Sequence, residues 1–365
     1  MKNACFHGGE SFEFIGNDFS NLKNKGKLIR ADMTDAWFDP APEVAKILKN
    51  NLSWLAKSTP PMYSEGLIKT ISKVRGIPEE NILAGAGSSD LIYLFFLKYC
   101  KSNSVILDPM YGEYAHIISN VLKKKVRRAN LGKTDGFRAN INYVAGKASK
   151  KSIVVIVNPN NPTGQYLRKS EVIKLLDGLP KGSVLVVDEA YIDYLGKKES
   201  VETLVPKRNN LVVLKSMSKI YALSGARVGY MVANKSIISE LKAYCPPWAV
   251  SAMGQVAAIT ALKNEGYYAK KIRETHRLRK EFCRKLNSVP HLKLYPSVAN
   301  FVLIELAGTA ETAKSICEKL KKRNIYVRNC NSQSTRFRNK FIRIAVRDKR
   351  SNGKIYSALK QILAK

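Results

Sequence analysis

Apolar runs and helical patterns alternate along the first two thirds of the chain. Short apolar runs rich in β-branched residues predict strands at Asn81–Ala84, Ser104–Leu107, Ser152–Val157, Ser183–Val187 and Leu211–Leu214. Segments of helical periodicity accompany them, at Pro42–Asn50, Ser64–Gly76, Ser88–Tyr99, Tyr111–Val121 and Glu171–Asp177. Because strands that alternate with helices favour right-handed βαβ units, we expect an α/β fold with a mostly parallel sheet covered on both faces.

The pattern changes after Trp248. Residues Gln255–Asn287 are almost entirely helical, with a break expected near Gly266, and so long a segment can link two domains. Beyond it, short strands and helices predict a smaller α+β domain, with strands at Leu292–Tyr295, Asn300–Glu305, Ile325–Val327 and Phe341–Ala345 and helices at Glu311–Arg323 and Gly353–Leu363. We therefore expect a large domain over residues 42–250, and an interdomain helix with the small domain over residues 251–365. The irregular segment 1–41 should pack with the small domain and the active site.

The composition is ordinary for a globular protein, with 45% hydrophobic and 25% charged residues in a chain of 365. No apolar run reaches the roughly 18–20 residues that span a bilayer. The first residues also lack the basic-then-apolar pattern of a signal peptide, so we expect a cytoplasmic protein without a membrane partner. The six cysteines include no C-x-x-C pair and no histidine at zinc-ligand spacing. This favours free thiols, mostly in the core, and predicts no metal site.

The net charge of +33 is unusual, and it leaves several interpretations open. A basic protein can bind nucleic acid nonspecifically. However, no helix-turn-helix, zinc finger or RNA-binding signature accompanies the charge, so we expect no specific nucleic-acid partner. The plainest interpretation is a solvated basic surface. A third interpretation is a positive field that draws anionic substrates, such as phosphate esters, towards the active site.

Polar segments follow the predicted strands, where ligands bind in a parallel sheet. The segment Lys215–Lys219 (KSMSK) directly follows one strand, and Arg227 lies eight residues further on. A lysine in such a loop can reach a cofactor carbonyl. Two hydroxyls and a guanidinium converging beside it suit a phosphate-bearing aldehyde.

Carboxylate and amide groups end the neighbouring strands. Asp188 follows one strand, and a carboxylate there could keep the ring nitrogen of a cofactor protonated. Tyr191, three residues on, could donate to a phenolic oxygen. The turn at 158–164 (NPNNPTG) aims the amide of Asn161. The small residues of 85–90 (GAGSSD) present N–H groups to an anion at a helix N-terminus, and Tyr111 could stack on an aromatic ring.

In this order, the segments resemble the motifs of a known family. The set G-S-S-D, D-P-x-Y-G-E-Y, N-P-N-N-P-T-G, D-E-A-Y and S-x-S-K-x-x-x-L-x-G-x-R is similar to that of fold-type-I pyridoxal-phosphate (PLP) aminotransferases of class I/II. The nearest branch resembles histidinol-phosphate aminotransferase, an enzyme of amino-acid biosynthesis, and threonine-phosphate decarboxylase. The resemblance is strong from Gly85 to Gly229 and looser through the C-terminal domain. It implies the PLP-transferase fold, with a seven-stranded sheet in the large domain, and a homodimer with pyridoxal 5'-phosphate at the subunit interface.

The resemblance also implies roles for the residues of the motifs. Lys219 is the expected Schiff-base lysine and proton carrier, and Asp188 is the expected partner of the pyridine nitrogen. Asn161 and Tyr191 are expected at the phenolic oxygen, and Tyr111 against the ring. The cofactor phosphate is expected among Ser88, Ser89, Ser216, Ser218 and Arg227.

Substrate residues follow from weaker parts of the resemblance. Arg343, in a Phe-Ile-Arg-Ile strand, corresponds to an arginine that holds the substrate carboxylate, and Asn300 corresponds to a residue lining the same site. His7 opens an H-G-G segment similar to that of threonine-phosphate decarboxylases, where the histidine helps bind the substrate phosphate. The chain departs from the family where TDAWFDP, containing Asp35, replaces an N-E-N-P-like stretch. It also lacks the R-Y-P segment, for which Tyr63 could substitute at the partner's cofactor.

Three functions follow from these patterns. As a transaminase, the protein uses Lys219 to move a proton from the substrate's α-carbon to the cofactor, on an amino acid or an amino phosphate ester and a 2-oxo acid. As a decarboxylase, it removes CO₂ from an O-phospho amino acid, and the pocket around His7 and Asp35 decides between the two reactions. As a non-catalytic basic protein, it retains only the fold. The intact set of Lys219, Asp188 and Arg227 favours an enzyme.

Overall fold

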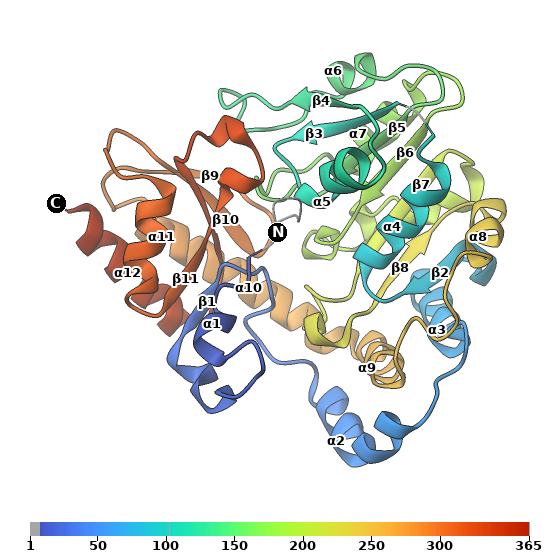
Figure 1. Ribbon diagram of the computed structural model, residues 1–365, viewed down its shortest axis with the longest axis horizontal. Coiled ribbons are helices and arrows are strands. Elements are labelled where there is room, and N and C mark those ends of the chain that lie inside the picture. Colours follow the sequence, from blue (N-terminus) through green and yellow to red (C-terminus); the bar gives the residue numbers. More distant parts are fainter. Residues whose placement is uncertain (1–7, 102, 365) are drawn as a thin grey trace.

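The computed structural model describes residues 8–101 and 103–364. These residues form two layered units, one around a seven-stranded sheet and one around a five-stranded sheet (Figure 1). The predicted α/β architecture is confirmed. No helix in the described ranges is long and apolar enough to cross a membrane.

The large sheet has the strand order β2-β8-β7-β6-β5-β3-β4. Strand β8 runs antiparallel to both of its neighbours, β2 and β7, and the other pairs are parallel. The strands are β2 (Ile82–Gly85), β3 (Ser104–Asp108), β4 (Val126–Asn130), β5 (Ile153–Val157), β6 (Val184–Asp188), β7 (Leu211–Ser216) and β8 (Gly229–Val232). The carboxyl ends of β5, β6 and β7 are therefore neighbours at one edge of the sheet.

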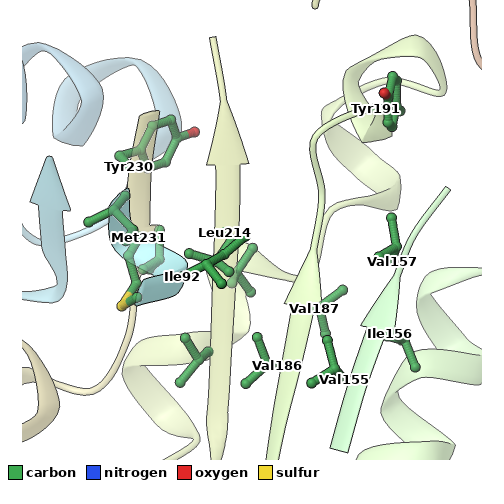
Figure 2. Packing of buried hydrophobic residues seen from close by; sticks show 14 of the residues in the cluster. Ile92, Val155, Ile156, Val157, Val186, Val187, Tyr191, Leu214, Tyr230 and Met231 are labelled. Atoms are coloured by element: carbon green, nitrogen blue, oxygen red, sulfur yellow. The ribbon is translucent and has the colours of Figure 1, made fainter. Parts of the chain in front are cut away.

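The centre of this sheet is apolar on both faces. Every residue of β5 is buried, as expected for a parallel strand with a layer on each side. Figure 2 shows Val155, Val187 and Leu214 packed along adjacent strands, with Tyr191 beyond the end of its strand. The helices of this part of the chain are α2 (Pro42–Lys57), α3 (Glu65–Arg75), α4 (Ser88–Tyr99), α5 (Gly112–Ala115), α6 (Ile141–Gly146), α7 (Lys169–Asp177), α8 (Lys235–Lys242) and α9 (Ala252–Lys263).

The small sheet has the order β1-β11-β12-β10-β9. Its strands are β1 (Ile29–Ala31), β9 (Leu292–Tyr295), β10 (Phe301–Leu306), β11 (Ile325–Asn329) and β12 (Phe341–Ala345), and its helices are α11 (Ala313–Lys321) and α12 (Lys349–Leu363). The N-terminal segment, with the short helix α1 (Phe12–Ile15), joins this sheet because β1 pairs in parallel with β11. The long helix α10 (Glu265–Leu286) runs from the large unit to the small one (Figure 1).

Several elements differ from the expectation. Strand β4 was missed because charges interrupt it, and only Ala129 of its five residues is buried. Strand β8, which begins with a glycine, was also missed. The break expected near Gly266 is present, and it falls at Asn264, two residues earlier, so that Gly266 lies in the first turn of α10. The helix expected over Tyr111–Val121 consists of α5 and a π-helical stretch at His116–Val121.

Candidate active site

A cavity of about 310 Å³ lies at the carboxyl ends of β5, β6 and β7. Residues of both units line it, since α4 and α5 contribute from the large unit and β11 and β12 from the small one. Eleven of the residues expected in the site share its wall: Ser88, Ser89, Tyr111, Asn161, Asp188, Tyr191, Ser216, Ser218, Lys219, Arg227 and Arg343. The ordered motifs of the sequence therefore converge on one place.

One end of the cavity is suited to a phosphate. Ser88 and Ser89 form the first turn of α4, where backbone N–H groups point outward and the helix dipole favours an anion. Arg227 lies across this turn, and it fits there because Gly87 has no side chain. A Cβ atom on Gly87 would lie 2.5 Å from Nη2 of Arg227. The hydroxyl groups of Ser216 and Ser218 line the same cavity.

Lys219 faces the cavity from the loop after β7. Its Nζ lies 3.7 Å from Oδ1 of Asp35, and its side chain is 17% exposed. Burial lowers the pKa of Lys219, and the positive charges of Arg343 and Arg227 lower it further, while Asp35 opposes the change. Asp35 is itself held by a 2.7 Å hydrogen bond from Oγ of Ser224. A lysine with a lowered pKa supplies the neutral amine that a nucleophile or general base requires.

Asp188 is the last residue of β6 and is 3% exposed. Oδ2 accepts a 2.8 Å hydrogen bond from the hydroxyl of Tyr114, and Oδ1 accepts one of 3.0 Å from the N–H of Ala190. Burial raises the pKa of Asp188, and these two hydrogen bonds act in the opposite direction. A buried carboxylate at the wall of a cavity favours a cationic partner there.

A hydrogen-bond network connects the two units through the cavity. The amide of Asn161 donates to the hydroxyl of Tyr191 at 3.4 Å and accepts from Nη1 of Arg343 at 2.6 Å. The hydroxyl of Tyr191 also lies 2.8 Å from Oγ1 of Thr34. Burial raises the pKa of Tyr191 to about 12, so its hydroxyl remains a donor at neutral pH.

Two arginines of the small sheet face each other at the cavity. Arg328 on β11 is directly opposite Arg343 on β12 in the antiparallel register, and both line the cavity. Like charges directly opposite each other on neighbouring strands repel. Nε of Arg343 is also buried without a hydrogen-bond partner among the described residues. This arrangement favours an anionic ligand that both guanidinium groups can contact.

Asp35, Asn300 and Tyr63 lie outside the wall of the cavity. Asp35 does not line the cavity but forms an ion pair with Lys219, which does. Asn300 is fully buried and donates a 2.9 Å hydrogen bond to the carbonyl of Thr34, which does line the cavity. His7 lies outside the described residues, and Tyr63 is 42% exposed on the surface.

Tyr114, Thr34 and Arg328 were not predicted as site residues from the sequence. The spacing of Tyr111 and Tyr114 was a usable signal, because residues three apart share a side of a helix. Arg328 was missed because the strand was expected to end at Val327, two residues before its observed end at Asn329. Thr34 has no signal of its own, since it lies in an irregular segment.

The residues present fit pyridoxal phosphate. The turn at Ser88 with Arg227 supplies a cradle for the phosphate, Lys219 supplies an amine for the aldehyde, and Asp188 supplies a buried carboxylate for the ring nitrogen. Tyr111 supplies an aromatic ring at the same wall. Together, an anion-binding turn, an amine and a carboxylate around one cavity match the phosphate, the aldehyde and the ring nitrogen of this cofactor.

Known proteins share this fold and sequence pattern. The family model of aminotransferases of class I and II matches residues 32–361. The histidinol-phosphate aminotransferase of Pelagibacter ubique is 31% identical, over 94% of each chain. The structure of histidinol-phosphate aminotransferase from Sinorhizobium meliloti in complex with pyridoxal-5'-phosphate has a TM-score of 0.83 and 21% identity, covering 100% of this chain and 99% of that one. L-threonine-O-3-phosphate decarboxylase from Porphyromonas gingivalis has a TM-score of 0.80 and 25% identity, covering 93% and 100%.

Proposed function

Because this chain belongs to the class I and II aminotransferases, in the branch of the histidinol-phosphate aminotransferases, we propose that its amino donor is a phosphorylated amine such as histidinol phosphate. The protein is an aminotransferase, and pyridoxal phosphate is its cofactor. The amino acceptor is a 2-oxo acid. The observation that carries the choice of donor is the pair of opposed arginines, Arg328 and Arg343, at the cavity.

The opposed arginines suit a phosphate better than a single carboxylate. A phosphate carries close to two negative charges at neutral pH and can accept hydrogen bonds from both guanidinium groups at once. Asn161 and the carbonyl of Asp32 orient Arg343, through hydrogen bonds of 2.6 Å each. The same pair can receive the carboxylates of the 2-oxo acid and its amino-acid product. One anion site would then serve both halves of the reaction.

The residues of the chain have distinct tasks in this proposal. Pyridoxal phosphate, when bound, supplies a ring that takes up the electron pair left on the substrate's α-carbon. Asp188 holds a proton on the ring nitrogen. Nζ of Lys219 would take the proton from the α-carbon of the substrate and deliver it to C4′ of the bound cofactor. Tyr191 and Asn161 donate to the phenolic oxygen, and Ser88, Ser89, Ser216, Ser218 and Arg227 hold the cofactor phosphate.

The proposal is tested by comparing histidinol phosphate with histidinol as amino donors to 2-oxoglutarate. Glutamate should form from the phosphorylated donor. In the variant Arg328→Gln, KM for that donor should rise roughly 10- to 100-fold, the effect of one lost hydrogen bond to a charged group. The slow reaction with unphosphorylated histidinol should change little. Equal losses with both donors would contradict the assignment of the arginine pair to the phosphate.

Decarboxylation is the alternative outcome of the same assay. The protein should be incubated with O-phosphothreonine and O-phosphoserine, and CO₂ should be measured. Release of CO₂ from either compound, without glutamate formation from histidinol phosphate, would replace the proposed reaction with the decarboxylase one. Borohydride reduction and peptide mapping should in either case attach the cofactor to Lys219, and attachment elsewhere would overturn its role.

We also propose that the protein is a homodimer. Apolar side chains on α2 and on two neighbouring loops are exposed, with Trp54 60% and Trp248 46% accessible. The loops adjoin because the N–H of Trp248 donates a 2.9 Å hydrogen bond to the carbonyl of Met62. Exposed apolar patches mark contact surfaces. Light scattering should give twice the mass of the chain, and Trp54→Glu should reduce it to that of a monomer.

A cytoplasmic location is part of the proposal. The described cysteines Cys100, Cys245, Cys283, Cys317 and Cys330 are all free thiols. Unpaired thiols are typical of reducing compartments. Cell fractionation tests this directly, and recovery of the protein outside the cytoplasm would contradict it.

A further inference from the structure

Tyr114 lies beneath the cavity and contacts the site through Asp188. It belongs to α5, three residues after Tyr111, which lines the cavity. Its side chain is fully buried, and its ring packs edge-on against Phe96. Its hydroxyl donates a 2.8 Å hydrogen bond to Oδ2 of Asp188. Tyr114 therefore does not line the cavity, but it holds the carboxylate of Asp188, which does.

Among the described residues, the carboxylate of Asp188 is held by hydrogen bonds and takes part in no ion pair. The groups that act on it are the hydroxyl of Tyr114 and the N–H of Ala190, against the effect of burial. The charge of Asp188 contributes to raising the pKa of three tyrosines, Tyr111, Tyr114 and Tyr191. All three are neutral at physiological pH. Burial raises the pKa of Tyr114 far above its ordinary value, so its hydroxyl keeps its proton and can only donate to the carboxylate.

We propose that Tyr114 is a positioning residue that keeps Asp188 ionised and oriented towards the ring nitrogen of the cofactor. This inference rests on the proposed role of Asp188. A hydrogen bond to the charged form of a carboxylate stabilises that form. An ionised Asp188 in turn stabilises a proton on the ring nitrogen, and the protonated ring is the better electron acceptor. Tyr114 thus acts on the chemistry without touching the cofactor.

The test is the isosteric variant Tyr114→Phe, with Tyr93→Phe as its matched control. Tyr93 on α4 also donates a short hydrogen bond to a carboxylate, at 2.7 Å to Oε1 of Glu113 on α5. Both substitutions remove one hydroxyl from a tyrosine–carboxylate pair at the same helix. Only the first pair includes a residue of the cavity wall.

The direct readout is the protonation of the ring nitrogen. Each protein is loaded with ¹⁵N-labelled pyridoxal phosphate, and the nitrogen shift is followed against pH. In Tyr114→Phe the nitrogen should lose its proton at lower pH than in the unchanged protein, because the neutral form of Asp188 is favoured. The acid limb of the kcat/KM profile should move to higher pH, and kcat/KM at neutral pH should fall roughly tenfold or more. Tyr93→Phe should leave all three quantities unchanged.

The outcomes separate this inference from the proposed function. If the ring nitrogen of the unchanged protein is unprotonated at neutral pH, the role of Asp188 itself is wrong. If it is protonated and Tyr114→Phe titrates as the unchanged protein does, Asp188 keeps its role and the role of Tyr114 is overturned. A fall in activity without a change in either titration would assign Tyr114 to packing alone, which also overturns it.

Discussion

Two lysines near the end of β7, the buried Lys215 and the half-buried Lys219, have opposite environments. Lys215 faces a cluster of buried ions on one side of the strand end, where its Nζ lies 3.2, 3.5 and 3.7 Å from carboxylate oxygens of Glu189, Asp193 and Glu202. Lys219 faces the cavity, with one carboxylate at 3.7 Å. Burial acts to lower both pKa values. The carboxylates outweigh it at Lys215, whose pKa is raised, while the pKa of Lys219 is lowered. Burial alone therefore does not make a lysine reactive.

The two carboxylates at the end of β6 also face different surroundings. Asp188 faces the cavity, whereas the next residue, Glu189, faces the ion cluster. Glu189 accepts hydrogen bonds from Oγ of Ser200 and, at 2.8 Å, from the N–H of Val201, as well as pairing with Lys215. Since successive side chains of a strand point to opposite faces, one strand end supplies both regions. The cluster holds the strand ends from which Asp188 and Lys219 face the cavity.

The ion cluster comprises Arg75, Glu189, Asp193, Glu202 and Lys215. Arg75 forms a bidentate pair with Asp193, at 3.0 and 2.7 Å, and comes from α3, far from β7 in the sequence. These pairs lower the pKa of Asp193 despite its burial. The charged ends of these groups pair with one another inside the protein, whereas the charged groups at the cavity border on open space. The comparison predicts that substitutions in the two regions affect different quantities.

The largest expected effect is that of Lys219→Ala. Loss of the amine that moves the α-proton should reduce kcat by at least roughly 10²- to 10⁴-fold, the range for a general base. The free energy of unfolding should change little, because Lys219 has only one partially exposed ionic partner. Single-turnover kinetics and urea denaturation measure the two quantities. A large loss of stability with little loss of turnover would show that Lys219 serves the fold and not the reaction.

The next effect is that of Lys215→Met, which acts on stability. It leaves Glu189, Asp193 and Glu202 buried with Arg75 as their remaining cation. Removal of one member of a buried ion pair costs about 3–5 kcal/mol of unfolding free energy. Urea denaturation should show this loss, and Glu189→Gln in the same chain should restore part of it by removing the unmatched charge. A stable Lys215→Met protein with its turnover abolished would contradict the division between cluster and cavity.

The positions of the strand ends could be predicted from the sequence. Which side chains there face the cavity and which face the ion cluster could not. Asp188 and Lys219 follow clear apolar runs, so their place at the sheet edge could be inferred. Lys215 belongs to the same short segment as Lys219, and only the packed structure shows that it faces Arg75 and Glu202. Those partners come from α3 and from the 3₁₀ helix at Glu202–Lys207, and no local pattern connects them with β7.

The strands β4 and β8 show why other parts of the fold were missed. The alternation of β4 is hidden by exposed arginines, which an edge strand tolerates because one of its sides faces solvent. Strand β8 is short, and it begins at Gly229, where a Cβ atom would lie 2.6 Å from the backbone nitrogen of Ser88. The glycine that weakens the strand signal is thus required for the close approach of the turn at Ser88.

The smallest expected effect is that of Asp35→Asn, which removes the single carboxylate beside Lys219. Asp35 opposes the lowering of the Lys219 pKa, so without its charge that pKa should fall further. In the cofactor-free protein, labelling of Lys219 by an amine-reactive reagent should then reach half its maximum at lower pH. The change should be modest, because the Asp35 side chain is 25% exposed and solvent screens the pair. Lys215 in the same sample is the internal control, since its raised pKa should keep it unlabelled in both proteins. Labelling of Lys215 alongside Lys219 would show that the ion cluster does not distinguish them.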